Sequence, residues 1–550
     1  MIYANIYKTY GNYFFDTKFK EKKAKLSNMG RMWIAVYLLI VSVHLSHQKS
    51  TPDSMTYIAA VVEYPPKYFS NANETLNVNS DAYVRLIRTA SLSNADIIVF
   101  PEDGLTTVNL PEREEMGDWT TIIPSPMDFY KPCTQNTIEV SNTLKKISCA
   151  ARDNEIYVVI NIAEKAPCNN IPCPRDKVFY YNSNVVFDRK GMIIARYRKT
   201  NLYGEHQFNV TLHPEVVSFN TDFGVKFGTF ICFDILFFEP ALILTRIKEI
   251  TDIVYPTAWF SETPFLTAVQ TQAGWSYAED VNLLASGYNR PSFGNVGSGI
   301  YLGRKGVGKK IMPKTTHEEI LIFEVPKIIK TKHNENYHDF SKSQAQRTSL
   351  DYQQKNQVND AMITINEILL KHEDIQIYQT FLLEKSTEKS ICQNNFCCEF
   401  KVEITKADPS VKYRLAVFNG ARRYYLDDAY VRACGIIQCS NDSVLSCNSV
   451  QESQTVFHNI EISTTLHNNK GELIMPSTLN SDLLTLENWT FNKHAHDNHV
   501  HVNMLLNSNT NNLVTFGIYV RNFDKSNANK ISFCIVNSLI LTVVMLFSNL

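Results

Sequence analysis

Short apolar runs rich in β-branched residues recur along roughly the first 330 residues and alternate with stretches of helical pattern. Such runs predict buried strands, and the stretches between them predict helices. The expected strands cover residues 56–64, 95–100, 155–163, 177–188, 192–197, 225–231, 253–256, 282–286 and 299–302. The expected helices lie around residues 80–91, 137–152, 240–248 and 265–278. This alternation predicts a layered α/β domain over residues 51–330.

The pattern changes after this domain. Residues 331–370 are polar and contain few apolar anchors, which is typical of a linker or a surface crossover. Residues 371–525 contain short alternating apolar runs and six of the twelve cysteines. This second pattern predicts a smaller β-rich domain that is stabilised by disulfides.

Both ends of the chain carry an apolar segment. Residues 33–45 follow a basic flank, and about a dozen apolar residues after positive charge are typical of a secretory signal peptide. We therefore assign residues 1–50 to an N-terminal extension and signal peptide, and a type II membrane anchor is the alternative. Residues 526–550 contain an apolar run without a basic tail, which predicts a glycosylphosphatidylinositol (GPI) attachment signal. A C-terminal transmembrane helix is the alternative for this tail.

These segments predict a protein that is secreted or held at the cell surface by a lipid anchor. The sequons at Asn73, Asn209, Asn441 and Asn488 are then predicted glycosylation sites, and we expect them on exposed surface. The formal net charge of −1 argues against a nucleic-acid partner, because dedicated nucleic-acid binders usually present a basic surface.

The number of cysteines singles out one of them. Cys534 lies in the tail that an anchor signal would lose, so eleven of the twelve cysteines remain in the secreted chain. If Cys232 is set aside, four cysteines within residues 133–173 and six within 392–447 could form five bridges. Cys232 ends an apolar run, and a thiol at the end of a buried strand faces a cleft more easily than one in the middle. No C-x-x-C pair is present, so we expect no zinc site.

Two further strands end in a residue that can take part in catalysis. Glu102 follows the expected strand 95–100, and Lys199 follows the strand 192–197. A single carboxylate or lysine in a loop is usually a solvated surface group, and a single cysteine is usually a buried structural one. Three such strand ends in one α/β domain are more informative, because strand ends can meet along one edge of a sheet.

The segments around these residues are similar to the nitrilase superfamily of carbon–nitrogen hydrolases, and most similar to its vanin and biotinidase branch. The matching segments are IVFPEDGL (98–105), ARYRKTNLYGEHQFN (195–209), GTFICFDILFFEPA (228–241), VYPTAW (254–259) and GSGIY (297–301). The resemblance covers most of residues 55–320 and extends loosely to the C-terminal domain. It implies an α-β-β-α sandwich with a smaller β-rich C-terminal domain.

The resemblance also implies roles for individual residues. Cys232 would be the nucleophile, Glu102 the proton acceptor, and Lys199 the proton donor that stabilises the oxyanion together with the backbone N–H of Phe233. Glu205 matches the second glutamate of the family and would support Lys199. Amide hydrolysis needs a nucleophile, a proton shuttle and an oxyanion site, and this set supplies all three. We expect neither a cofactor nor a metal.

The expected substrate is a small linear amide. The vanins cleave pantetheine to pantothenate and cysteamine, whereas biotinidase cleaves biotinyl amides, and the lipid-anchor tail favours the vanin side. The chain departs from the family around residues 261–263 and 288–290, which we expect to form the rim of the pocket. A different class of function also stays open: an inactive protein of nitrilase fold that is displayed at the membrane as a binding module.

Two other motifs are weaker. Residues 303–309 fit the spacing of a phosphate-binding loop, but Lys310 stands where a serine or threonine would bind magnesium, so we expect a basic surface turn. The tract of His494, His496, His499 and His501 could bind a metal in an extended segment, but we expect a polar strand or loop.

Overall fold

The computed structural model describes residues 49–168, 173–328, 368–424, 427–467, 471–496 and 498–523. The described residues from Thr51 onward belong to one compact unit. The predicted signal segment 33–45, almost all of the linker 331–370 and the predicted GPI signal 526–550 lie outside the described residues. Among the described residues, no helix is long and apolar enough to cross a membrane.

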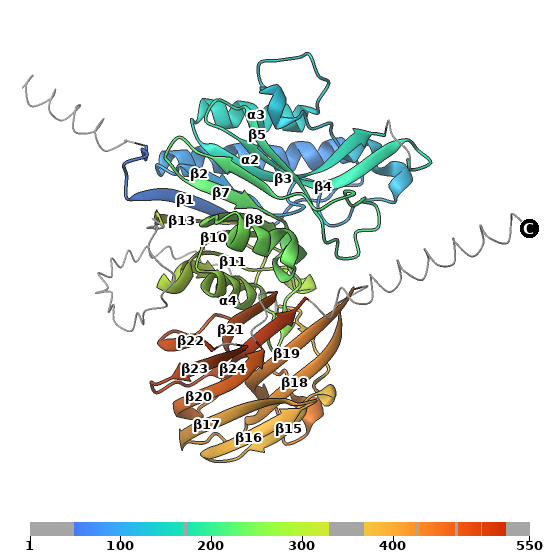
Figure 1. Ribbon diagram of the computed structural model, residues 1–550. Helices are drawn as coiled ribbons and strands as arrows, with labels where there is room; N and C mark the ends of the chain where they lie inside the picture. The colour runs from blue at the N-terminus through green and yellow to red at the C-terminus, as the bar shows by residue number, and fades with distance from the viewer. Residues whose placement is uncertain are drawn as a thin grey trace, which may run out of the picture. The chain divides into compact units, whose positions relative to one another are not determined.

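The N-terminal domain is built on two six-stranded sheets (Figure 1). The first has the order β13-β1-β2-β3-β4-β5, and the second has the order β12-β11-β10-β8-β7-β6. The strands of the first sheet are β1 (Thr56–Glu63), β2 (Ile97–Val99), β3 (Tyr157–Pro167), β4 (Val178–Phe187), β5 (Ile193–Arg198) and β13 (Glu319–Pro326). Those of the second are β6 (Val217–Asn220), β7 (Lys226–Thr229), β8 (Asp252–Thr257), β10 (Asn282–Gly287), β11 (Ser298–Leu302) and β12 (Val307–Ile311). In each sheet three adjacent strands run parallel, and the outer strands are antiparallel to their neighbours.

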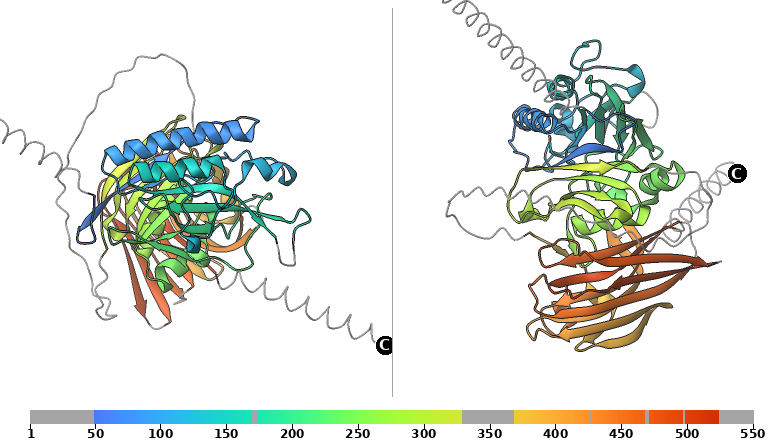
Figure 2. Two further views of the ribbon diagram at one scale, coloured as in Figure 1. Left: turned by 90° about the horizontal axis from the view of Figure 1, so that it is seen from above. Right: turned by 90° about the vertical axis from the view of Figure 1, so that its left-hand side faces the viewer.

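Both faces of the first sheet are buried. Alternate residues of a strand point to opposite sides, so one set packs on the helices and the other on the second sheet. Ala60 and Val62 of β1 pack under the helices α2 (Ala72–Leu92) and α3 (Asn142–Asp153). Ala59 and Val61 instead join a core that includes Phe227 of β7 and Ile300 of β11 in the second sheet. The two helices lie side by side over the sheet (Figures 1 and 2).

The second sheet carries the other helical layer. Alternate residues such as Tyr255 and Leu283 pack against α4 (Ala268–Glu279) and the π-helix η4 (Phe238–Ile247). The order of layers is therefore helix, sheet, sheet, helix, as the resemblance implied. The short 3₁₀ helices of the described chain are η1 (Arg113–Trp119), η2 (Pro126–Asp128), η3 (Cys232–Leu236), η5 (Pro291–Phe293), η6 (Gly303–Lys305), η7 (Ile375–Ile377) and η8 (Val444–Ser446).

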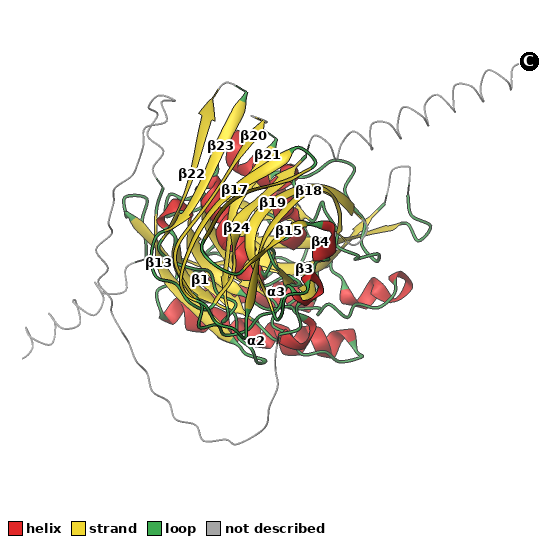
Figure 3. Cartoon of the chain, turned by 90° about the horizontal axis from the view of Figure 1, so that it is seen from below, coloured by secondary structure: helices red, strands yellow, loops and turns green. Residues whose placement is uncertain are grey.

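The C-terminal part consists almost entirely of strands (Figure 3). One sheet has the order β15-β18-β19-β24-β21, and the other has the order β16-β17-β20-β23-β22. Their bounds are β15 (Gln379–Leu383), β16 (Thr387–Gln393), β17 (Phe396–Lys406), β18 (Lys412–Tyr424), β19 (Asp427–Cys439), β20 (Val456–His467), β21 (Glu472–Asn480), β22 (Trp489–His496), β23 (His499–Leu506) and β24 (Leu513–Asn522). The inner faces of the two sheets share one apolar core, which confirms the β-rich prediction.

Several contacts join the C-terminal strands to the N-terminal domain, and two of them involve whole elements. The short strand β14 (Lys371–His372) pairs in parallel with β9 (Glu262–Thr263), so the chain re-enters the N-terminal domain before the C-terminal sheets begin. Strand β21 packs against α4, where Met475 and Trp275 belong to the same buried core.

The cysteines form five disulfides, as the arithmetic of the sequence predicted, and Cys232 is the one free cysteine among the described residues. The pairs are Cys133–Cys149, Cys168–Cys173, Cys392–Cys397, Cys398–Cys434 and Cys439–Cys447. The pair Cys398–Cys434 joins β17 of one C-terminal sheet to β19 of the other.

The remaining motifs of the sequence fall on the surface. The sequon residues Asn73, Asn441 and Asn488 are exposed, whereas Asn209 is half-buried and its side-chain oxygen accepts a hydrogen bond from Arg113. Residues 303–309 form the short helix η6 and the start of strand β12, not a loop that leads into a long helix. The four histidines lie on the exposed hairpin of β22 and β23.

Candidate active site

The structure brings the three predicted strand ends together. Glu102 follows β2 and Lys199 follows β5 in the first sheet, whereas Cys232 begins η3 just after β7 of the second sheet. The relative exposures of Glu102, Lys199 and Cys232 are 2%, 2% and 6%. The site therefore lies between the ends of the two sheets and is almost closed to solvent.

An ion network surrounds the ammonium group of Lys199. Its Nζ lies 2.6 Å from Oε1 of Glu102 and 2.7 Å from Oε2 of Glu205. The backbone N–H of Ala258, which follows β8, donates to the other oxygen of Glu102 at 2.8 Å. Glu102 is thus held through both of its oxygens, so the direction of its carboxylate is fixed.

Asn182 of β4 fixes the distance between the two carboxylates. Its amide nitrogen donates to Glu102 at 2.9 Å and to Glu205 at 2.6 Å. Its own side-chain oxygen accepts from the buried Asn161 of β3 at 2.6 Å, and Asn161 also contacts Asn184. This row of amides was not predicted from the sequence. The sequence contained one signal for it: three asparagines lie inside runs that are otherwise typical of buried strands. A buried amide needs hydrogen-bond partners, so such residues point to a polar network.

The turn that carries Cys232 is held in an unusual conformation. Cys232 has a φ of 45°, in the left-handed region that residues with a side chain rarely adopt. The hydroxyl of Tyr255 donates to its carbonyl oxygen at 2.8 Å. The backbone N–H of Ile231, just before it, donates to the carboxylate of Asp234 at 3.0 Å. These bonds pin the backbone on both sides of the thiol.

Asp234 also ties this turn to the segment that carries Lys199. Its carboxylate accepts hydrogen bonds from the hydroxyl of Tyr197 at 2.7 Å and from the backbone and side chain of Asn201 at 2.9 and 2.8 Å. Burial raises the pKa of Asp234 to about 6, although these donors oppose the shift. The turn that carries Cys232 and the segment that carries Lys199 are therefore positioned by one shared carboxylate, a role that the sequence did not indicate.

The charges around the thiol decide its resting state. Burial raises the pKa of Cys232 well above its ordinary value, the Glu102 carboxylate raises it further, and Lys199 lowers it in part. Cys232 therefore rests as a neutral thiol, and a base would have to take its proton before the sulfur could act as a nucleophile. Burial alone would lower the pKa of Lys199, but the carboxylates of Glu102 and Glu205 raise it well above its ordinary value. Lys199 therefore stays an ammonium group.

Two hydrogen-bond donors in the segments that carry Lys199 and Cys232 are not taken up by acceptors of the described residues. The ammonium of Lys199 has three N–H donors, and the two carboxylates occupy two of them. Phe233 is the second residue of η3, and the first N–H groups of a helix have no acceptor within the helix. These two donors satisfy the chemical requirement for an oxyanion site.

A pocket opens beside Cys232. It encloses about 360 Å³ of space, a figure that includes its open mouth. Aromatic side chains form much of its wall, including Tyr203, Phe233 and Trp259 of the N-terminal domain and Tyr424 of β18. The lining includes Glu262 from the first of the two expected rim segments, but no residue of the second, 288–290. Tyr424 was not predicted to line the pocket, because it lies in the C-terminal domain.

Comparison with known proteins shows which family the chain belongs to. Residues 58–273 match the carbon-nitrogen hydrolase family, and residues 368–526 match the vanin C-terminal domain. The first match defines the class of protein: an enzyme that hydrolyses carbon–nitrogen bonds of amides. The second match narrows it further, because the vanin C-terminal domain covers the whole β-rich part.

Two curated relatives align along most of their length. Vanin-like protein 1 of Drosophila melanogaster is 38% identical over 532 residues, which cover 90% of both chains. The pantetheinase of Homo sapiens is 31% identical over 455 residues, which cover 79% of this chain and 82% of that protein. The chain therefore belongs to the vanin family of carbon–nitrogen hydrolases. A crystal structure of Saccharomyces cerevisiae Nit3, of branch 10 of the nitrilase superfamily, covers 51% of this chain and 93% of its own, with 19% identity and a TM-score of 0.40.

Proposed function

We propose that this chain is a pantetheinase-like amidase that is secreted or GPI-anchored and forms a thioester on Cys232. Several relatives are named pantetheinase, among them the proteins of Canis lupus familiaris and Bos taurus, which are 33% and 32% identical and cover 74% and 78% of this chain. Their name supports pantetheine as the substrate, with pantothenate and cysteamine as the products.

One observation carries the proposal. A buried carboxylate and a buried ammonium group lie 2.6 Å apart, and both are close enough to shift the pKa of the one free thiol among the described residues. Burying three such groups is costly unless they interact, and a strongly perturbed thiol beside a pocket is typical of a catalytic centre. The arrangement supports catalysis over a display role.

The first half of the reaction would form the acyl-enzyme. Glu102 takes the proton of the Cys232 thiol while the sulfur attacks the amide carbonyl carbon. The third N–H of Lys199 and the backbone N–H of Phe233 stabilise the negative oxygen of the tetrahedral intermediate. The carbon–nitrogen bond then breaks, and Glu102 passes its proton to the departing amine. The products of this half are the free amine and a thioester on Cys232.

The second half would hydrolyse the thioester. Water attacks the same carbonyl carbon, and Glu102 accepts a proton from it. The carbon–sulfur bond breaks, the carboxylic acid leaves, and the proton returns to the thiol. Glu205 and Asn182 keep Lys199 and Glu102 in place through both halves, because they bond to these groups and not to the sulfur.

The location of the protein belongs to the same proposal. Five disulfides favour an oxidising compartment such as the cell exterior. We propose an amidohydrolase domain over residues 51–330 and a β-rich domain over residues 371–525, with a signal peptide before them and a GPI signal after them. Asn73, Asn441 and Asn488 are the more accessible of the proposed glycosylation sites.

The proposal is tested with purified protein, pantetheine and a biotinyl amide. We expect release of cysteamine from pantetheine, no release by C232A, and little or no cleavage of the biotinyl amide. Mass spectrometry of the quenched reaction should show a pantothenoyl adduct on the peptide that contains Cys232. Cleavage of the biotinyl amide without any cleavage of pantetheine would contradict the proposed substrate. No cleavage of either amide would favour the display role.

A further inference from the structure

The pocket beside Cys232 contains a carboxylate that the proposed reaction does not use. Glu262 is the one charged side chain among the described residues that line it, and its neighbours there are mainly aromatic or aliphatic. A carboxylate in such a wall loses hydration, so it needs partners of its own. The partners of Glu262 therefore indicate whether it is structural or faces a ligand.

One oxygen of Glu262 has a fixed partner. Arg422 of β18 donates from Nη2 to Oε1 of Glu262, and its Nε lies 3.1 Å from Oε1 of Glu373. The side chain of Arg422 is only 6% exposed, and the adjacent carboxylates keep its guanidinium paired. Glu262 also lies in β9, where the backbone pairs with Lys371 of β14. Both the backbone and the first carboxylate oxygen are thus held by residues that follow the linker.

The second oxygen of Glu262 has no hydrogen-bond donor among the described residues. It belongs to a side chain that lines the pocket, and that side chain is 20% exposed. A carboxylate oxygen accepts hydrogen bonds and cannot donate them when ionised. The second oxygen of Glu262 is therefore a hydrogen-bond acceptor in the wall of a pocket that is otherwise largely apolar.

We infer that Glu262 is a specificity-determining residue that accepts a hydrogen bond from a hydroxyl or N–H group on the acyl arm of the substrate. The inference rests on the proposed function and adds the chemistry by which the acyl arm is recognised: neutral, with hydrogen-bond donors. The pantothenoyl arm carries two hydroxyl groups, and a biotinyl arm carries ureido N–H groups. Both would meet this requirement, whereas an arm without a donor would cover this carboxylate oxygen and leave it without a hydrogen bond.

Arg422 makes the direction of this hydrogen bond testable. In E262Q the single amide oxygen is drawn to the guanidinium of Arg422, so the amide NH₂ faces the pocket. In this variant the amide NH₂ faces the hydroxyl or N–H group of the ligand, so two hydrogen-bond donors meet. The size and shape of the side chain are unchanged. A hydrogen bond to a charged group typically accounts for about a 10- to 100-fold difference in affinity.

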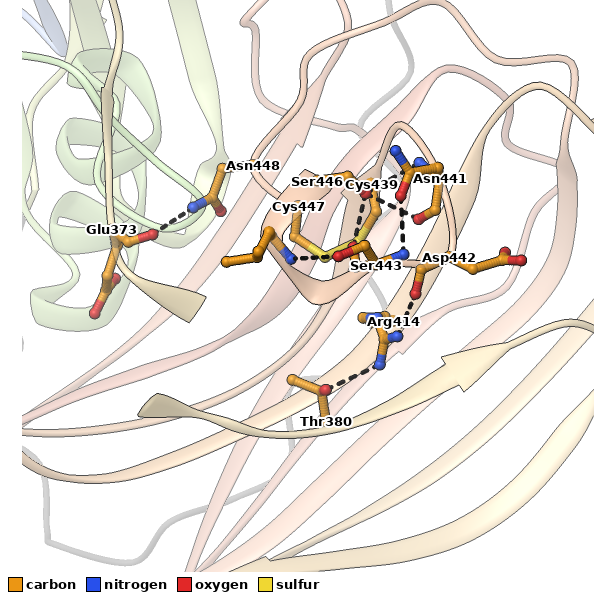
Figure 4. The surroundings of a disulfide bond; sticks show 11 residues. Glu373, Thr380, Arg414, Cys439, Asn441, Asp442, Ser443, Ser446, Cys447 and Asn448 are labelled. Atoms are coloured by element: carbon orange, nitrogen blue, oxygen red, sulfur yellow. Dashed lines mark hydrogen bonds between the residues drawn. A yellow bond between two sulfur atoms is a disulfide. The ribbon is translucent and has the colours of Figure 1, made fainter. Parts of the chain in front are cut away.

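Glu373 offers a matched control. It pairs with the same Arg422 and is buried, but it is not part of the lining of the Cys232 pocket. Its backbone carbonyl accepts from Asn448, next to the disulfide Cys439–Cys447, and its side chain points away from Asn448 (Figure 4). E373Q should disturb the ion cluster as E262Q does, without changing the pocket. Thermal unfolding of both variants then measures the shared structural effect.

The experiment measures binding to C232A by calorimetry, so that it does not depend on turnover. The ligands are a pantothenamide, its dideoxy analogue without both hydroxyls, and biotinamide. We expect E262Q to weaken binding of the pantothenamide by about 10- to 100-fold and that of the dideoxy analogue by less than about twofold. E373Q should leave the difference between the two ligands unchanged. With active protein and pantetheine, E262Q should raise KM by a similar factor and leave kcat nearly unchanged.

The outcomes separate this inference from the proposed function. Equal loss for both pantothenoyl ligands, no loss, or absence of binding by every donor-bearing ligand would overturn the role of Glu262. If only biotinamide binds and E262Q weakens its binding, the role of Glu262 is supported. The acyl arm of the substrate is then a biotinyl group and not a pantothenoyl group. Failure of the wild-type protein to cleave pantetheine concerns the proposed function alone, because the binding measurement does not require cleavage.

Discussion

The amide of Asn182 orients the carboxylates of Glu102 and Glu205 at once. Replacing it with alanine should leave Glu102 and Glu205 free to turn, while Cys232 and the pocket stay in place. We expect N182A to lower kcat by about 10²-fold with a smaller change in KM, because small misplacements of catalytic groups have effects of this size. Steady-state kinetics with pantetheine measures both constants.

Asn184 provides the control for this prediction. It lies two residues further along β4 and donates to the hydroxyl of Thr229, not to either carboxylate. N184A should therefore lose clearly less activity than N182A. Equal losses in the two variants would mean that the amides act through general packing of the strand.

The reactivity of Cys232 should respond in opposite directions to its two charged neighbours. Glu102 raises the pKa of the thiol and Lys199 lowers it. Removing the carboxylate therefore increases the thiolate fraction at a given pH, and removing the ammonium decreases it. We expect E102Q to be alkylated faster than the wild type by iodoacetamide at pH 8 to 9, and K199M to be alkylated more slowly, although both lose turnover.

The pH profile adds a second test of the same arrangement. Because the pKa of Cys232 is raised, alkylation of the wild type should still increase through pH 9 without reaching a plateau. K371M is the control, because Lys371 lies on the aromatic rings of Tyr203 and Phe260 and does not contact the thiol. A plateau near pH 7 would show that the resting cysteine is already a thiolate.

The candidate catalytic residues could be predicted from the sequence, whereas the residues that hold them in position could not. Glu102, Lys199 and Cys232 each follow an apolar run, so a strand end could be assigned to each of them. Asn182 lies inside such a run, where its contacts depend on the pairing of β3 with β4. Arg422 lies 160 positions after Glu262, and no local pattern connects the two.

At the scale of elements, strand β1 ends in a carboxylate that holds both ends of the connection between β10 and β11 in the other sheet. Glu63 is fully buried and accepts hydrogen bonds from Asn289 at 2.9 Å, from Ser298 at 2.5 Å and from the backbone of Gly297 at 3.2 Å. Burial raises the pKa of Glu63 to about 8, against these donors. The folded protein therefore keeps this proton up to about pH 8, whereas the unfolded chain loses it near pH 4.5.

This shift predicts how stability depends on pH. A raised pKa in the folded state contributes stability below the unfolded pKa, and that contribution is lost as the pH rises to the folded pKa. Between pH 4.5 and 8, Glu63 should thus lower the free energy of unfolding by about 3 to 5 kcal/mol. In E63Q the free energy of unfolding should not show this decrease between pH 4.5 and 8, because glutamine does not titrate. Urea unfolding of both proteins at pH 5 and pH 8 measures it, and equal slopes would contradict the prediction.

The order of helices and strands in the first domain could be predicted largely from the hydrophobic pattern, but the strand at the edge of its first sheet could not. Strand β13 pairs with β1 from more than 250 residues away, and the expected domain boundary covered it without assigning it a strand. The helix predicted at 80–91 begins eight residues earlier, because Asn71 caps it and polar residues such as Asn79 are buried by contacts with loops. Long-range pairing decided the first feature, whereas a local cap and contacts with nearby loops decided the second.

At the scale of the whole molecule, the two domains meet where α4 packs on β21. A methyl group added at Gly274 would lie 2.3 Å from the backbone oxygen of Pro476, a distance at which the two elements must move apart. Alanine is favoured over glycine inside a helix by about 1 kcal/mol, so an isolated α4 would gain stability. Overpacking a close contact typically costs about 1–3 kcal/mol, and backbone atoms cannot turn away as a side chain can.

We therefore expect G274A to lower the stability of the protein despite its better helix propensity. G117A is the matched control, because a methyl group at Gly117 meets no atom within 4 Å. Thermal unfolding of the two variants beside the wild type should show a lower Tm for G274A and almost none of that loss for G117A. Since Tyr424, Arg422 and Glu262 adjoin the Cys232 pocket from both domains, G274A should also raise the KM for pantetheine. An unchanged or higher Tm for G274A would show that the contact between α4 and β21 is looser than the structure indicates.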